Sequence, residues 1–405
     1  MTAIASPAPP TGPLLRERAF AALWGAGVLN GVMRWLELLV VGLYVFQQTG
    51  SPFLTALAAM LRLAPMALFG PFFGALADAL GRRRLYIWLT VFTGAAAAAQ
   101  AALAFAGAIE IWHLMAGCFV TGTYWTADMP ARRLLLAEAA GGKRVAKAML
   151  LDTLSNNVTR MLGPLVGGGV LELFGLAGTF VFSFMTCAVA LVLVLRVREA
   201  TPAPHSGTWR IAANILEGLG IARRSPAIVG TLLITVLFNV FSFPTSGMVP
   251  VIGEEKLLLT PALIGLLSAC EGAGATLGSV LLTLFAREAW YKRVYWGGLL
   301  LCYLSILALT AADWAVLAGL AIFFMGLGVA GFSAMQSTLI YMTVPPEARS
   351  RIMGLLTFCI GTAMLGFLHI GWLAGAIGPA PALAIMATEG LLLLLLVLWR
   401  WREIR

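Results

Sequence analysis

Charged side chains are scarce in this sequence: they make up 11% of its 405 residues, whereas 60% of the residues are hydrophobic. Soluble domains carry about 25% charged residues, so this composition excludes a chain whose surface is mostly covered by water. The long apolar runs instead reach the length of about 20 residues that crosses a bilayer as a helix. They also lack the alternation of a membrane barrel. The composition therefore predicts an all-α membrane protein.

The sequence also lacks the motifs of several chemistries. It contains no Gly-Lys-Ser/Thr phosphate loop, no zinc-ligand spacing and no Ser-His-acid arrangement beyond chance. Its cysteines stand singly in apolar runs, as packing residues do, at Cys118, Cys187, Cys270, Cys302 and Cys359. We therefore predict no enzyme activity, no ATP-driven transport, no cofactor and no bound metal.

Twelve apolar runs have the length of a membrane span. They cover residues 19–46, 53–77, 84–107, 111–134, 146–174, 176–197, 227–251, 261–286, 291–311, 314–341, 351–376 and 380–399. The only sizeable polar connection, 198–226, divides six spans from six, and apolar residues at helical spacing within it predict an amphipathic surface helix. We expect six-helix bundles at 19–197 and 227–399, with tails at 1–18 and 400–405.

The net charge of +9 is explained by where the basic residues lie. Of the 27 Lys and Arg residues, 23 fall on alternate loops or on the tails, whereas the opposite loops carry only Lys256. The positive-inside rule then predicts that both termini are cytoplasmic. A nucleic-acid partner is not needed to explain the charge.

Two glycine-containing motifs stand at the ends of spans or inside them. One reads Gly74-Ala-Leu-Ala-Asp78-Ala-Leu-Gly81-Arg82, between the second and third spans, and the other reads Gly163-Pro164-Leu-Val-Gly167-Gly168, inside the fifth. Glycines allow tight turns and close helix approach, and a proline kinks a helix in lipid. The segment Pro130-Ala-Arg132-Arg133 precedes the fifth span and has a counterpart, Pro346-Glu-Ala-Arg349, before the eleventh.

Together these segments resemble the major facilitator superfamily, in particular the drug:proton antiporter group that includes macrolide efflux pumps and the enterobactin exporter. The resemblance implies two rocking six-helix bundles in a bacterial inner membrane and export driven by proton influx. It also implies a conformational latch and hinge at Gly74, Asp78, Gly81, Arg82, Arg132, Gly163, Pro164, Gly167 and Gly168. The chain departs from the group at Arg62, where apolar or amide residues are usual.

Charged residues deep in apolar spans mark cavities, pairs or proton paths, because charge in hydrocarbon is costly. We expect three acids to couple protons, with Glu271 the first choice and Glu37 and Asp152 the others. Glu37 and Arg34, three residues apart on one helix face, can pair directly, either as a structural pair or with a role in coupling or substrate binding. Glu271 has the alternative role of a structural carboxyl between helices, and Asp152 that of a gate residue.

Polar and aromatic residues in the same spans predict the substrate cavity. Those residues are Asn30, Arg34, Arg62, Trp125, Asn156, Arg160, Asn239, Phe243, Gln336 and His369. For Arg160 two partners remain open, an anionic substrate or a carboxylate such as Glu37. His369 is either a titrating group or a packing residue.

Three functions remain in competition. The first is a proton-coupled exporter of an amphipathic small molecule, either a drug or a siderophore-like compound. The second is a facilitator or flippase for an anionic amphiphile such as a lysophospholipid, which the arginines at 34, 62 and 160 favour. The third is a membrane receptor without transport. In each case we expect a monomer that contacts membrane lipid.

Overall fold

The computed structural model describes residues 13–141, 144–197, 219–223, 225–344, 348–401 and 403, and the described chain is helical throughout. The first half contains the short η1 (Leu14–Arg16) and the long helices α1 (Arg18–Thr49), α2 (Pro52–Leu80), α3 (Arg82–Phe105), α4 (Ile111–Ala140) and α5 (Val145–Leu195). The second half contains α7 (Pro226–Phe241), α8 (Thr245–Glu255), α9 (Pro261–Phe285), η3 (Glu288–Trp290), α10 (Tyr291–Ala311), α11 (Ala315–Thr343), α12 (Arg349–Gly361), α13 (Ala363–Ile377) and α14 (Pro379–Arg400).

The described helices account for the predicted spans. Ten stretches are long and apolar enough to cross a membrane, with α7–α8 and α12–α13 each counting once. Of these, α5 is 51 residues long and reverses at Gly175, so it supplies two spans. The 30-residue α4, which carries Tyr124, Asp128 and Arg132, is not among the ten, but its length is that of a span. The described chain thus has twelve spans.

Gly175 is the residue at which the fifth and sixth predicted spans were separated. Its backbone angles, φ 67° and ψ −170°, lie in a region that only glycine adopts without strain. The seventh and eleventh spans were predicted as continuous and are each interrupted. The helix of the seventh span is interrupted between Phe241 and Thr245, where Pro244 cannot donate a backbone hydrogen bond. The helix of the eleventh span is interrupted at Thr362.

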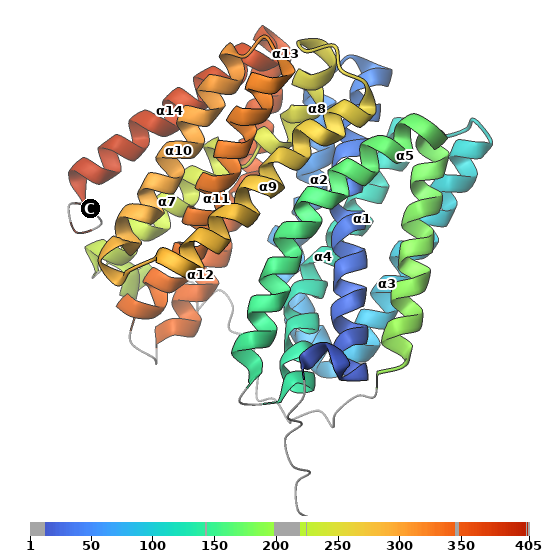
Figure 1. Cartoon of the computed structure of the whole chain (residues 1–405), viewed down its shortest axis with the longest axis horizontal. Helices are drawn as coiled ribbons and strands as arrows, with labels where there is room; N and C mark the ends of the chain where they lie inside the picture. Colours follow the sequence, from blue (N-terminus) through green and yellow to red (C-terminus); the bar gives the residue numbers. More distant parts are fainter. Residues whose placement is uncertain are drawn as a thin grey trace, which may run out of the picture.

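The helices form two bundles that lie side by side (Figure 1), α1–α5 in blue to green and α7–α14 in yellow to red. They contact each other along two helix pairs, α5 with α9 and α2 with α13, and α8 packs on α1 and α2. The predicted linker helix lies outside the described residues, apart from the helical turn at 219–223.

The glycine motif of α5 allows both kinds of contact that α5 makes. Gly163 lies so close to α1 that a Cβ there would come within 2.5 Å of the Trp35 Cβ. Gly168 faces the other bundle, where a Cβ would collide with the carbonyl oxygen of Pro261 and lie 3.0 Å from the Cα of Gly265. Small residues therefore bring α5 against α1 on one side and against α9 on the other.

Candidate functional site

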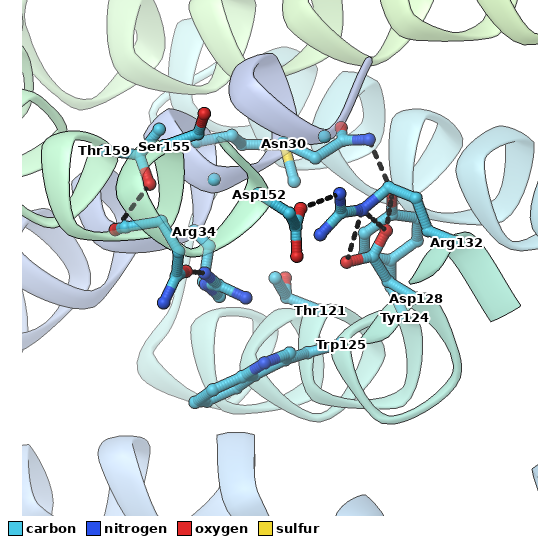
Figure 2. Close-up of a pocket in the computed structure, with 14 residues that line it drawn as sticks. Asn30, Arg34, Thr121, Tyr124, Trp125, Asp128, Arg132, Asp152, Ser155 and Thr159 are labelled. Carbon is cyan, nitrogen blue, oxygen red and sulfur yellow. Dashed lines mark hydrogen bonds and ion pairs between the residues drawn. The ribbon is translucent and has the colours of Figure 1, made fainter. Parts of the chain in front are cut away.

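A cavity lies inside the first bundle, between α1, α4 and α5 (Figure 2). We call it the polar chamber. It encloses ≈ 430 Å³ of space not filled by atoms, part of it open solvent, and is lined by Gly27, Asn30, Gly31, Met33, Arg34, Thr121, Tyr124, Trp125, Asp128, Arg132, Asp152, Ser155, Asn156 and Thr159. It thus brings together five of the residues predicted from sequence as cavity or coupling groups, Asn30, Arg34, Trp125, Asp152 and Asn156.

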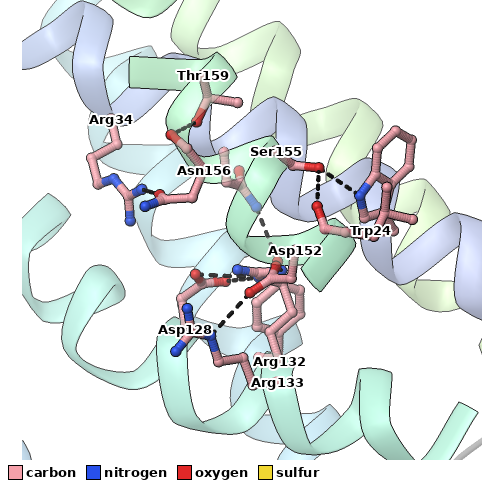
Figure 3. A network of polar contacts seen from close by, with 12 residues as sticks. Trp24, Arg34, Asp128, Arg132, Arg133, Asp152, Ser155, Asn156 and Thr159 are labelled. Atoms are coloured by element: carbon pink, nitrogen blue, oxygen red, sulfur yellow. Dashed lines mark hydrogen bonds and ion pairs between the residues drawn. The ribbon is translucent and has the colours of Figure 1, made fainter. Parts of the chain in front are cut away.

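At one end of the polar chamber an ion-pair network joins α4 to α5 (Figure 3). The Arg132 guanidinium lies 3.2 Å from an Asp128 oxygen and donates to Asp152 at 2.5 Å. Arg133 donates to the other Asp152 oxygen at 3.0 Å. Asp152, one of the predicted proton carriers, is therefore bound by two arginines of α4.

Two buried tyrosines extend this network to α1 and α3. The Asn30 amide donates to the hydroxyl oxygens of Tyr124 at 2.5 Å and Tyr86 at 3.1 Å, and the Tyr124 hydroxyl lies 3.3 Å from Asp128. Our reading of the sequence missed Asp128, Tyr86 and Tyr124. The spacing of Tyr124, Asp128 and Arg132 at four-residue steps was the available signal, because it aligns the three side chains on one face of a helix.

The pair that Arg34 and Glu37 could form on α1 is not observed. Glu37 lies 3.6 Å from the guanidinium of Arg62 on α2 and accepts a hydrogen bond from Thr121 at 3.1 Å. Arg34 turns toward α5 and donates to the Asn156 amide oxygen at 2.5 Å. The two α1 side chains therefore contact different helices, Arg34 reaching α5 and Glu37 reaching α2 and α4.

Arg160 forms an ion pair across the two bundles. Its partner is Glu271 on α9, and both side chains are largely buried, with 13% and 9% of their surface exposed. The Arg160 guanidinium also lies 4.8 Å from the centroid of the Trp35 ring. Of the two partners left open for Arg160, a carboxylate across the cavity is thus the one observed, but it is Glu271 and not Glu37.

A second cavity lies between the bundles, and we call it the aromatic chamber. It encloses ≈ 320 Å³ of space not filled by atoms, again with some open solvent, and is lined by Arg34, Trp35, Leu38, Ala59, Arg62, Leu63, Trp125, Phe243, Ser246 and Phe367. Residues of α1, α2 and α4 face residues of α8 and α13 and of the turn before α8. Arg34 and Trp125 line both chambers, so they stand at the boundary between the polar and the aromatic one.

Other predicted cavity residues lie apart from the two chambers. Gln336 donates to the Thr235 hydroxyl at 3.1 Å and Asn239 to the Thr235 backbone carbonyl at 2.9 Å, inside the second bundle. His369 on α13 lies 3.8 Å from Glu389 on α14 and edge-on to a ring of α7. These side chains therefore contact partners within their own bundle.

The latch motif is described in part. Gly81 has a positive φ of 85° between α2 and α3, and Arg82 donates to Glu138 at the end of α4 at 2.5 Å. Gly74 and Asp78 lie outside the residues whose side chains the structure describes. Among the described residues, no three His, Cys, Asp or Glu side chains are grouped closely enough to hold a metal ion.

Comparison with known proteins gives distant but extensive matches. Macrolide efflux protein A of Streptococcus pyogenes is 22% identical over 371 residues, which cover 89% of this chain and 90% of that protein. The uncharacterized MFS-type transporter YfiS of Bacillus subtilis is 25% identical over 92% of this chain and 91% of its own. The multidrug efflux pump Tap of Mycolicibacterium fortuitum is 29% identical over 54% of each chain.

Solved structures match the fold as a whole. A POT family transporter superimposes with a TM-score of 0.78 at 12% identity over 98% of both chains, and the nucleoside transporter NupG with 0.74 at 12% identity over 94% of this chain and 99% of that one. These similarities confirm the major facilitator fold. The sequence profile of the transmembrane secretion effectors (MFS_3) matches residues 8–403. The chain is therefore a multi-pass membrane transporter of the major facilitator superfamily and belongs to its transmembrane secretion effector family.

Proposed function

We propose that this transporter exports an amphipathic small molecule from the bacterial cytoplasm in exchange for protons, by alternating access. The efflux proteins among its relatives support the direction, and the alternation of basic loops supports cytoplasmic termini in the cell membrane. The aromatic chamber supports the mechanism, since both bundles line it. A cavity that is lined by both bundles changes its shape and its access when the bundles rock against each other.

The ion pair between Arg160 and Glu271 is the observation that carries proton coupling. It joins α5 to α9, so relative motion of the bundles stretches or breaks it. A proton that reaches Glu271 cancels the charge of its carboxylate, and the neutral form no longer attracts the arginine. Proton binding and bundle separation then favour each other. Glu37 is the second candidate for the proton carrier, because its partner Arg62 lies in the same bundle and their ion pair does not join the two bundles.

The test uses inside-out membrane vesicles with an imposed pH gradient, acidic inside. A macrolide and a set of fluorescent amphiphiles of either charge serve as candidate substrates. We expect the gradient to drive accumulation of at least one of them and Glu271→Gln to abolish the gradient-dependent part. The matched control is Glu255→Gln, since Glu255 is exposed at the end of α8. Accumulation that persists after the gradient is collapsed, together with an active Glu271→Gln variant, contradicts proton coupling.

A facilitator for an anionic amphiphile is the second candidate, and Arg34 and Arg62 in the aromatic chamber favour it. It differs from the first in energetics and not in fold. A facilitator equilibrates its substrate at any imposed pH gradient, whereas the exporter concentrates it. The same vesicles therefore distinguish the two, by whether internal substrate rises above its external concentration.

A further inference from the structure

The charged side chains around the two chambers do not balance. In the described part of the chain, the charged residues that line them are Arg34, Arg62, Arg132, Asp128 and Asp152, and the ion pairs next to them add Arg133, Arg160, Glu37 and Glu271, which makes five arginines and four acids. Every acid has an arginine partner: Arg62 for Glu37, Arg132 for Asp128, Arg132 and Arg133 for Asp152, Arg160 for Glu271. Arg34 alone of the five forms no ion pair with a described residue.

The surroundings of Arg34 satisfy its hydrogen bonds only in part. One guanidinium nitrogen donates to Asn156, while the Nε atom is buried and has no described partner. The guanidinium lies 4.8 Å from the centroid of the Trp125 ring and 5.5 Å from that of Trp35, so it is within cation–π range of both rings. In Figure 2 it stands beside Trp125, at the opposite end of the polar chamber from Arg132. A buried cation without a counterion is costly, so the site favours an incoming anion.

The other half of the site is apolar and aromatic. Next to Arg34, the aromatic chamber is walled by Trp35 and Trp125 from the first bundle and by Phe243 and Phe367 from the second. Flat rings stack well against such walls, and indole faces accept both rings and cations. The two chambers together offer a charged pocket adjoining an aromatic one, with Arg34 and Trp125 shared between them.

We propose that the preferred substrate is an amphipathic anion, with a carboxylate, sulfonate or phosphate group on a flat aromatic body. Arg34 binds the anionic group at the edge of the polar chamber, with Asn156 fixing the guanidinium in place. The aromatic body lies between the two tryptophans and the two phenylalanines. This inference rests on the proposed transport function, because it assigns the two chambers to the transported molecule.

The test compares three probes that share one aromatic body and differ in charge: 1-pyrenebutyrate, 1-pyrenebutanol and 1-pyrenebutylamine. Their affinities for the purified full-length transporter in detergent are measured by quenching of tryptophan fluorescence. A hydrogen bond to a charged group contributes enough for about a tenfold gain in affinity. We therefore expect the anion to bind about tenfold more tightly than the alcohol, and the amine more weakly than either.

Three variants locate the effect. Arg34→Gln is expected to remove the preference for the anion while the alcohol still binds. Asn156→Asp supplies the missing counterion at the atom that Arg34 already contacts, so it is expected to raise the thermal unfolding temperature and also to remove the preference. This variant keeps the test decisive if Arg34→Gln folds poorly. Arg287→Gln, in an exposed position on the loop after α9, controls for general electrostatic attraction and is expected to leave the preference unchanged.

Each outcome decides the proposal. Equal binding of the three probes, tightest binding of the amine, or an anion preference that survives both Arg34→Gln and Asn156→Asp would overturn it. Binding is measured without any gradient, so failure of proton coupling in vesicles leaves this result intact. Conversely, proton-coupled export of a cationic or neutral compound, together with equal probe binding, would refute the substrate class and retain the proposed function.

Discussion

Two adjacent glycines on α5 give the sharpest test of how the bundles meet. A Cβ added at Gly168 would collide with the Pro261 carbonyl oxygen and lie 3.0 Å from the Gly265 Cα, both on α9. A Cβ added at Gly169 would meet no atom within 4 Å. Gly168→Ala and Gly169→Ala are thus the same chemical change on the same helix, and only the first disturbs the interface.

The expected change in the free energy of unfolding follows from two opposing effects. Alanine favours a helix over glycine by about 1 kcal/mol, and this gain is common to both variants. Overpacking a close contact costs about 1–3 kcal/mol, and the neighbour at Gly168 is rigid backbone and cannot rotate away. We therefore expect Gly169→Ala to raise the free energy of unfolding by up to about 1 kcal/mol, and Gly168→Ala to lie about 1–3 kcal/mol below it.

Unfolding of the purified protein by SDS in mixed micelles, followed by tryptophan fluorescence, measures this difference. The glycine-to-alanine propensity cancels when the two variants are compared with each other, so the difference reports the contact with α9. Gly265→Ala is the reciprocal variant, since its Cβ would collide with the Pro164 carbonyl oxygen, and it should match Gly168→Ala. Equal stabilities of the Gly168 and Gly169 variants would refute the close packing of α5 on α9.

Three further perturbations test other contacts by the same unfolding measurement. Arg160→Gln and Glu271→Gln should each lower the free energy of unfolding by about 3–5 kcal/mol, because each leaves a buried charge unpaired. The double variant should lose less than the sum of the two, and additive losses would argue against the ion pair. Asp152→Asn should cost about 3 kcal/mol by depriving the buried Arg132 of a carboxylate, and an unchanged stability would contradict that network. Gly175→Ala should cost about 1–3 kcal/mol through backbone strain alone, since its surroundings are open, so a neutral result would refute the sharp reversal.

Helix positions were predictable because hydrocarbon imposes the length and polarity of each span on the sequence itself. Even the reversal at Gly175 is visible, as the boundary between two apolar runs that the chain joins without a polar loop. The break before α8 was missed because Phe241, Phe243 and Pro244 continue an apolar run. Hydropathy does not register a lost backbone hydrogen bond when the surroundings stay apolar.

Pairing of the charged residues was far less predictable. Glu37 could reach Arg34 on its own helix but pairs with Arg62 on α2, and the observed partner of Glu271 lies 111 residues away. Helical spacing shows which side chains share a face, but the rotation of each helix about its axis decides which neighbour they meet. That rotation is determined by packing, here by glycines such as Gly163 that admit a large residue from α1.

The two bundles contribute unequally to the site, and this bears on how coupling can work. The first supplies all five arginines around the chambers and three of the four acids, whereas the second contributes Glu271 and aromatic walls. Eight residues of α5, about 12 Å, separate Arg160 from the Gly168 contact. On the proposed function, the proton therefore acts about two helical turns from a close backbone contact between the bundles, and parting Arg160 from Glu271 requires α5 and α9 to move relative to each other.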